Sequence, residues 1–182
     1  MFLNITDTEG TTTMNRHRRL LLGSLLTFPA VTAWSQGALA RPSGPVVVTV
    51  TGAIRHTNRD KTAVFDLDML EALPQRTLRT ATPWHSGVVA FTGPTGVAFL
   101  DAVGATGQTL VIAALNDYKV RVPVQDLRQH GVVLATRLNG ERMRVRDKGP
   151  LFLIYPFDDD PALKSEAYFN RSIWQIKTIH VE

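Results

Sequence analysis

Two short segments carry the side chains best suited to bind a ligand or to move a proton. Trp84-His85 combines an aromatic ring with a histidine, a residue that titrates near neutral pH. Asn116-Asp117-Tyr118 offers an amide, a carboxyl group and a phenol in consecutive positions. His85 and Asp117 together would allow acid–base chemistry, such as a hydrolysis that needs no cofactor. Asn-Asp is also an ordinary turn pair, so the second segment has a purely structural interpretation as well.

An anion could be bound by four basic residues of the C-terminal third: Arg144, Arg146, Lys148 and Arg171. Charged residues at the edge of a hairpin also block pairing with other strands, which is a structural alternative for the same side chains. The five histidines show no metal-ligand spacing such as H-x-x-x-H. The sequence therefore offers candidate contacts for a ligand and no recognisable metal site.

Composition excludes several classes of protein. The 182-residue chain has no cysteine, which rules out disulfides, thiolate metal sites, c-type haem attachment and iron–sulfur clusters. It has 20 Lys plus Arg against 16 Asp plus Glu, a net charge of +4 at pH 7. These basic residues form no long block, so nothing in the charge pattern favours nucleic acid as a partner.

The N-terminus predicts export. Met14–Arg19 is basic, Leu20–Thr32 is a short apolar stretch, and Ala38-Leu39-Ala40 matches the small-x-small pattern of a signal peptidase site. The apolar stretch is too short, and too interrupted by Pro29, for a stable membrane span, although a transmembrane anchor stays the alternative. We expect residues 1–40 to be an N-terminal extension and cleaved signal peptide. Residues 41–182 would then form a single periplasmic domain with no transmembrane anchor after cleavage.

The export route stays open between two alternatives. Arg18-Arg19 followed by a leucine run is similar to a twin-arginine signal, which carries proteins already folded around a cofactor. Arginine pairs also occur in ordinary secretory signals, and His17 stands where a serine or threonine is expected. The sequence therefore does not choose between the secretory and the twin-arginine route.

Short strands with a few short helices are expected to position these residues. A helix is predicted over 66–73, where Asp66 can cap it, and another over 97–103, where Val97, Leu100 and Val103 share a face before Gly104. Apolar runs and alternating patterns predict the strands. These lie at 46–50, 78–82, 88–91, 110–115, 118–122, 132–137, 142–145, 151–155 and 177–181. A helical turn is expected at 123–130, and a polar loop with room for one helical turn at 156–170. No rhythm of long helices separates the strands, so the fold class is α+β and mostly β.

The C-terminal third also carries a recognisable series of motifs. Asn116-Asp117-Tyr118 is followed by Leu134-Ala135, the hairpin signal Asn139-Gly140, Gly149-Pro150-Leu151 and a closing Trp174. This series resembles the oxidoreductase molybdopterin-binding domain, the catalytic fold of the sulfite oxidase superfamily. The resemblance covers most of residues 46–182 and is most specific over 110–176. It implies the sulfite-oxidase-type molybdopterin-binding domain fold and allows molybdopterin as a cofactor.

The chain departs from that family at the residue that binds the metal. The family holds molybdenum through a cysteine, and the resemblance places Thr80 at this position, with Trp84 as the aromatic residue that follows. A thiolate is a soft anionic ligand, whereas an unperturbed threonine hydroxyl is neutral and hard, so an ordinary polar strand residue is the favoured interpretation of Thr80. Two cationic residues expected near the cofactor are replaced by Phe152 and Ile173.

The resemblance implies a cleft at ten candidate positions, with no catalytic residue and no metal ligand assigned. The candidate cleft residues are Thr80, Trp84, His85, Asn116, Asp117, Tyr118, Arg144, Arg146, Lys148 and Arg171. Trp174 could also wall a pocket, although core packing is its favoured interpretation.

Three functions follow as alternatives. We expect an exported periplasmic protein that has lost molybdenum chemistry, holds no cofactor, and binds a small anionic ligand or a membrane-bound sensor or redox partner. The second alternative is an active molybdopterin-dependent oxidoreductase whose metal has no cysteine ligand. The third is the cofactor-free acid–base enzyme using His85 and Asp117, which rests on the types of side chain alone.

Overall fold

The computed structural model of the chain describes residues 39–182. The basic and apolar parts of the predicted signal peptide, residues 14–32, lie outside the described residues. Within the described range, no helix is both long enough and apolar enough to cross a membrane.

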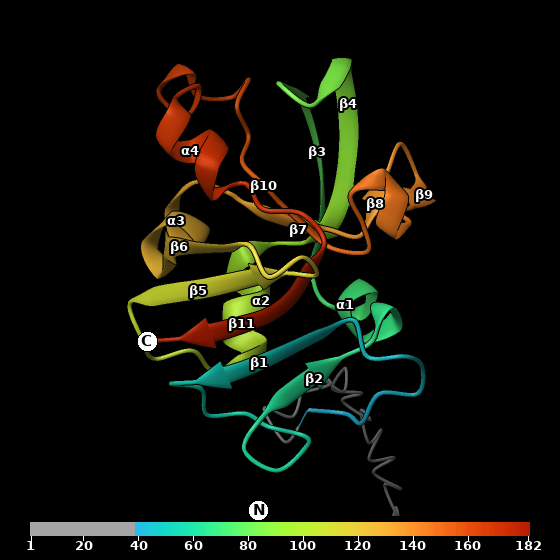
Figure 1. The fold of residues 1–182 in the computed structure, drawn as a ribbon, viewed down its shortest axis with the longest axis vertical. Coiled ribbons are helices and arrows are strands. Elements are labelled where there is room, and N and C mark those ends of the chain that lie inside the picture. Colours follow the sequence, from blue (N-terminus) through green and yellow to red (C-terminus); the bar gives the residue numbers. More distant parts are fainter. Residues whose placement is uncertain (1–38) are drawn as a thin grey trace, which may run out of the picture. The chain divides into compact units, whose positions relative to one another are not determined.

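The largest core rests on a five-stranded sheet made of β1 (Val48–Gly52), β2 (Ala63–Phe65), β5 (Thr109–Ala114), β6 (Lys119–Pro123) and β11 (Ile176–Val181). The strands lie in the order β2-β1-β11-β5-β6 (Figure 1). β1 runs parallel to β11, with Thr49 opposite Thr178, and the other neighbours are antiparallel. The last strand of the chain therefore lies in the middle of this sheet, beside the first.

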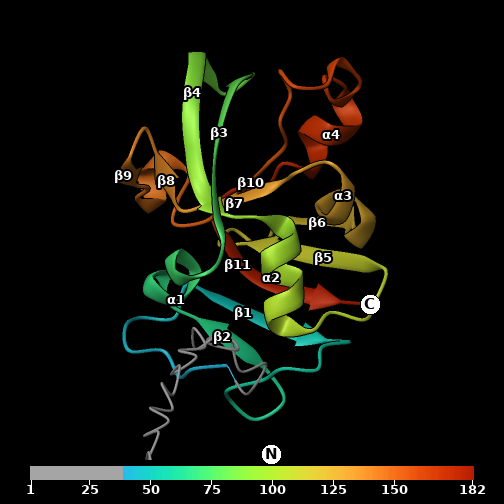
Figure 2. The ribbon, with the colours of Figure 1, turned by 180° about the vertical axis from the view of Figure 1, so that it is seen from behind.

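Helix α2 (Gly96–Val103) covers one face of the five-stranded sheet and lies in front of it in Figure 2. Thr95 caps its start by accepting a hydrogen bond from the Ala98 N–H at 3.1 Å, and Gly104, at φ +61°, ends it as predicted. Phe99, Leu100 and Val103 are fully buried in the core.

The prediction that Val97 lies on the buried face of this helix was wrong, because its side chain is 38% exposed. The sheet lies against a stripe centred on Phe99 and Leu100, so Phe99 takes the inward position that the spacing assigned to Val97.

A second layer is built on the long hairpin of β3 (Gln75–Thr82) and β4 (His85–Pro94). This hairpin continues into β8 (Arg137–Leu138) and β9 (Glu141–Arg142), and beside it β7 (Val133–Ala135) pairs with β10 (Phe152–Ile154). Leu78, Phe91, Val133 and Phe152 are buried in a smaller core between these strands. The predicted strands at 78–82 and 88–91 are confirmed and extend further than their apolar runs.

The predicted strand over 142–145 was wrong. Pairing ends at Arg142, and a 3₁₀ turn, η1 (Val145–Asp147), follows. The turn forms because the Arg144 carbonyl accepts hydrogen bonds from the N–H groups of Asp147 and Gly149, while the Arg144 guanidinium pairs with the Asp147 carboxylate at 2.8 Å. These local contacts outweigh the strand propensity of the segment.

The remaining helices are short: α1 (Leu67–Ala72), α3 (Val124–Gln129), η2 (Pro161–Leu163) and α4 (Glu166–Arg171). Asp66 caps α1 through the Met69 N–H, as predicted. The segment 156–170, expected to be a polar loop with room for one helical turn, contains η2 and all but the last residue of α4. In Figures 1 and 2, α4 and the β3–β4 hairpin project from the same end of the five-stranded sheet. The predicted α+β, mostly β fold is confirmed.

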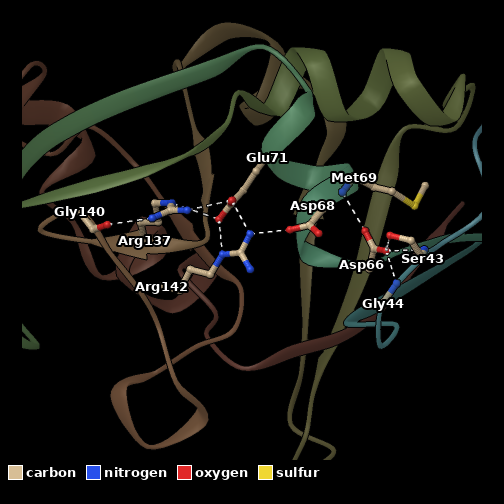
Figure 3. A network of polar contacts seen from close by, with 9 residues as sticks. All are labelled: Ser43, Gly44, Asp66, Asp68, Met69, Glu71, Arg137, Gly140 and Arg142. Carbon is tan, nitrogen blue, oxygen red and sulfur yellow. Dashed lines mark hydrogen bonds and ion pairs between the residues drawn. The ribbon is translucent and has the colours of Figure 1, made fainter.

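A network of charges attaches α1 to the β8–β9 hairpin (Figure 3). The guanidinium groups of Arg137 and Arg142 each donate two hydrogen bonds to the Glu71 carboxylate, at 2.7 to 3.1 Å. Arg142 also donates to Asp68 at 2.6 Å. The hydrogen bonds from Arg142 are the main reason that the pKa of Glu71 lies below its ordinary value. At neutral pH, every charge in this network faces an opposite charge.

Candidate functional site

A pocket of about 400 Å³ lies where the β3–β4 turn, the β5–β6 turn and the segment following α4 come together. Its lining residues are uncharged and mostly aromatic or amide side chains. They are Pro83, Trp84, Ala114, Asn116, Tyr118, Phe169, Asn170, Ser172, Ile173 and Trp174. Three of the ten predicted cleft residues, Trp84, Asn116 and Tyr118, are thus brought together in one pocket.

Trp84 forms the wall of the pocket from the turn between β3 and β4. Its ring centroid lies 5.7 Å from that of Trp174 and 6.1 Å from that of Phe169, both in edge-to-face geometry. It also packs against Phe152 and Phe157 at 5.7 and 6.4 Å, so it contacts both cores. Each such aromatic pair contributes about 1 kcal/mol beyond its buried area, and the wall is therefore held rigidly by packing.

The β5–β6 turn presents Asn116 and Tyr118. Asp117 occupies its centre at φ +64°, a left-handed conformation that Asp adopts more readily than most residues. The Asn116 Oδ1 accepts the Tyr118 N–H at 3.2 Å, which fixes the amide and leaves its NH₂ group free to donate. Tyr118 remains 53% exposed. Asp117 is itself exposed and does not line the pocket.

Arg171 attaches α4 to α3 through Asp126. Its guanidinium donates to the buried Asp126 carboxylate at 2.8 Å, and the Tyr155 hydroxyl donates to the same oxygen at 2.8 Å. Burial, followed by this hydrogen bond to Asp126, raises the pKa of Tyr155 far above its ordinary value. Arg171 therefore positions the neighbouring pocket residues Asn170 and Ser172 rather than lining the pocket itself.

Lys148 and His85 lie beside the pocket. The Lys148 Nζ is 4.9 Å from the centroid of the Trp174 ring, a cation–π distance. Lys148 forms no ion pair with any acidic residue between positions 39 and 182. His85 Nδ1 lies 2.9 Å from the Thr82 hydroxyl, and its ring packs 5.5 Å from Phe91. Burial and the nearby charge of Lys148 lower the pKa of His85, so the ring is neutral at pH 7.

The other three predicted residues lie away from the pocket lining. Thr80 is fully buried on β3, and its hydroxyl accepts the Asp158 N–H at 3.1 Å. The Ala81 N–H donates to the Asp158 carboxylate at 2.7 Å, so this contact attaches the 156–160 loop to the hairpin. The exposed Arg144 and Arg146 lie 2.8 and 3.9 Å from the carboxylate of Asp147.

Sequence reasoning missed Phe169, Asn170 and Ser172. Phe169 and Asn170 fall at the end of the stretch expected to be a polar loop, and Ser172 follows it. The Tyr168-Phe169-Asn170 run inside that polar stretch was the available signal, since two adjacent aromatics seldom lie in a solvated loop. Trp174, which was interpreted mainly as a core residue, both packs in the core and lines the pocket.

Of the comparisons with known proteins, the one with solved structures supports the fold. No family model and no curated protein matches the sequence. Among solved structures, the sulfane dehydrogenase SoxCD from Paracoccus pantotrophus matches with a TM-score of 0.54 and 17% identity. The match covers 74% of this chain and 37% of that one, so the chain spans a little over a third of its neighbour. The fold is of the sulfite oxidase type. At this identity the likeness speaks for the fold alone.

Proposed function

We propose that this chain is an exported, periplasmic binding module on a sulfite-oxidase-type fold that has lost molybdenum chemistry, and that its pocket binds a small anionic ligand. One observation carries the proposal. An aromatic pocket of about 400 Å³ lies beside Lys148, a cation with no acidic partner among residues 39–182. A membrane-bound sensor or redox partner would receive the signal of the bound ligand.

The residues present do not fit a molybdenum–pterin centre. The chain has no cysteine, and the position that the resemblance assigns to the metal ligand holds Thr80. Its hydroxyl is fully buried, accepts the Asp158 N–H at 3.1 Å and donates its proton to the Ala81 carbonyl at 3.3 Å, so both its proton and its oxygen are already used within the fold. Arg144 and Arg171, two of the cations expected to hold the anionic cofactor, are paired with Asp147 and Asp126.

An acid–base enzyme using His85 and Asp117 also fits the arrangement poorly. Asp117 lies exposed on the β5–β6 turn, whereas His85 lies against the smaller core and bonds to Thr82. Neither side chain lines the pocket, and no hydrogen bond joins them within the described part of the chain. General acid–base catalysis needs both groups within hydrogen-bond reach of one substrate, so binding is the better-supported function.

The experiment that tests the proposal is elemental analysis for molybdenum, together with pterin fluorescence after acid oxidation. The protein should be exported by a host that makes the cofactor, and a cysteine-ligated enzyme of the same fold, produced in the same host, serves as the positive control. We expect metal and pterin in the control and neither in this protein. Near-stoichiometric molybdenum and pterin would overturn the proposal.

The second candidate is a molybdopterin-dependent oxidoreductase without cysteine ligation, which the fold likeness to a sulfane dehydrogenase favours. It predicts a twin-arginine route, because the cofactor would be loaded before export. Replacing both arginines, Arg18→Lys and Arg19→Lys, should then block export. If export continues at the level of the unchanged signal, this candidate loses its main physiological requirement.

A further inference from the structure

We infer that the ligand of the pocket is an aromatic monocarboxylate, whose ring lies against the Trp84, Trp174 and Tyr118 side chains and whose acid group is neutralised by Lys148. The inference rests on the proposed function and narrows the anionic ligand to one chemical class. Three properties of the site support it: the shape of the walls, the free hydrogen-bond donors and the Lys148 ammonium, which has no acidic partner among residues 39–182.

The walls favour a flat ring. Four of the ten lining residues are aromatic, and Trp84 makes edge-to-face contacts with both Trp174 and Phe169. A wall that cannot rearrange selects ligands by shape, and aromatic faces gain most from another planar ring. The volume of about 400 Å³ is at the small end of ligand pockets, which suits a ligand of one or two rings.

Several polar groups of the pocket are free to donate a hydrogen bond to a ligand. The Asn116 Oδ1 is already occupied by the Tyr118 N–H, so this amide presents only its NH₂ group. An indole has a donor and no acceptor, and the N–H groups of Trp84 and Trp174 have no partner among residues 39–182. Because no buried side-chain N or O atom in that range lacks a partner, both indole N–H groups are accessible. A ligand rich in acceptor oxygens complements such a pocket.

The charge of the site calls for one negative group. None of the lining residues is charged, and Lys148 lies beside them without an acidic partner in the described range. The Asp117 carboxylate is exposed on the β5–β6 turn and does not line the pocket. The backbone of Lys148 is held in place by Gln175. The Gln175 backbone N–H donates to the Lys148 carbonyl at 3.3 Å, and the Gln175 side-chain amide donates to the Val145 carbonyl at 2.7 Å. The Lys148 ammonium lies on Trp174 and is close enough to His85 to lower the pKa of that ring. A single carboxylate would match this single cation, whereas a neutral ring would leave it unmatched.

The test is calorimetric titration of the exported, metal-free protein with three matched probes: 4-hydroxybenzoate, its neutral amide 4-hydroxybenzamide, and the non-aromatic cyclohexanecarboxylate. We expect 4-hydroxybenzoate to bind at least about 10-fold more tightly than either of the others, since each lacks one of the two recognised features. Lys148→Gln should remove the preference for the acid over the amide, and Lys148→Arg should keep it. Tyr118→Leu should weaken both aromatic probes alike. Lys61→Gln, at an exposed lysine on the β1–β2 connection, is the matched control and should change nothing.

The outcomes separate this inference from the proposed function. Equal affinity for acid and amide, equal affinity for the aromatic and the saturated acid, or no binding of any probe would overturn the inference. If sulfate or an aliphatic acid binds instead, and Lys148→Gln abolishes that binding, the proposed anion-binding function stands while the aromatic class fails. If the protein carries stoichiometric molybdenum and pterin, the proposed function itself fails.

Discussion

Charged and polar groups are paired in the network around Glu71 and are left without partners beside the pocket. In the network around Glu71, two arginines and two carboxylates neutralise one another and attach α1 to the β8–β9 hairpin (Figure 3). Beside the pocket, Lys148 has no acidic partner within residues 39–182, and the indole N–H groups of Trp84 and Trp174 are left unpaired. Folding alone explains the first arrangement. The second leaves interactions unmade that a bound ligand would complete.

The difference also separates the residues that hold the pocket from those that would contact a ligand. Trp84 and Arg171 are used for packing and pairing, so changing them should act on stability first. Lys148 and Tyr118 contribute little to the fold, so changing them should act on binding first. Substitutions in each group therefore test the comparison.

The largest effect is expected for Trp84→Ala. The ring contacts both cores, so its removal should lower the free energy of unfolding by about 3 kcal/mol and abolish ligand binding. Chemical denaturation measured by circular dichroism gives the change. Tyr118→Ala, which removes an aromatic ring that is half exposed, is the control and should cost less than about 1 kcal/mol. Similar losses for the two variants would show that Trp84 does not join the cores.

Glu71→Ala should destabilise the protein by about 2 kcal/mol, because it leaves Arg137 and Arg142 without their shared carboxylate, whose side chain is only 18% exposed. The same denaturation experiment measures this loss. Glu141→Ala, at an exposed residue of the same hairpin, should change stability by less than about 0.5 kcal/mol. Ligand binding should be unaffected by either change. A Glu71 variant as stable as the wild type would mean that the network does not contribute to the free energy of unfolding.

Acidification should weaken the two regions in different pH ranges. The pKa of His85 is lowered from 6.5 in the folded protein, mainly by burial, so the unfolded chain binds the proton first and stability falls as the pH drops below 6.5. The pKa values of Glu71 and Asp66 are lowered from 4.5 and 3.8, so their contributions are present above those values and are lost further down. Unfolding free energies measured across this range should therefore fall in two steps. His85→Gln should remove the upper step, and Glu71→Gln should reduce the lower one.

Local signals in the sequence were sufficient for the elements that their own residues determine. Asp66 and Gly104 predicted where α1 begins and where α2 ends, because a cap acts on the backbone within one turn. The hairpin at Asn139-Gly140 was confirmed with both residues at positive φ, the conformation that this turn requires. The β1–β11 pairing, by contrast, joins opposite ends of the domain, and no local pattern encodes it.

The candidate site was predictable only in part for the same reason. Trp84, Asn116 and Tyr118 could be found by their residue types, since aromatics and amides at turns are typical of binding sites. The lining residues between positions 169 and 174 reach the pocket only because α4 folds back against the hairpin. The contact between Arg171 and Asp126, which are far apart in the sequence, stabilises this position of α4. The burial of Thr80 likewise depends on the Asp158 N–H of a distant loop.

Lys148→Gln should have the smallest effect on the fold and the clearest effect on function. The substitution keeps a residue that tolerates φ near +65° no worse than lysine does, and it removes the cation–π contact with Trp174 but no ion pair, so the free energy of unfolding should change by less than about 1 kcal/mol. Anion affinity should fall by about 10-fold, because the substitution removes the cation that lies on the Trp174 ring beside the pocket. Thermal unfolding with and without 4-hydroxybenzoate measures both quantities on one sample. A stable variant with unchanged anion affinity would show that Lys148 does not contact the ligand. Lys148 would then have no more part in ligand binding than Arg142 of the Glu71 network has.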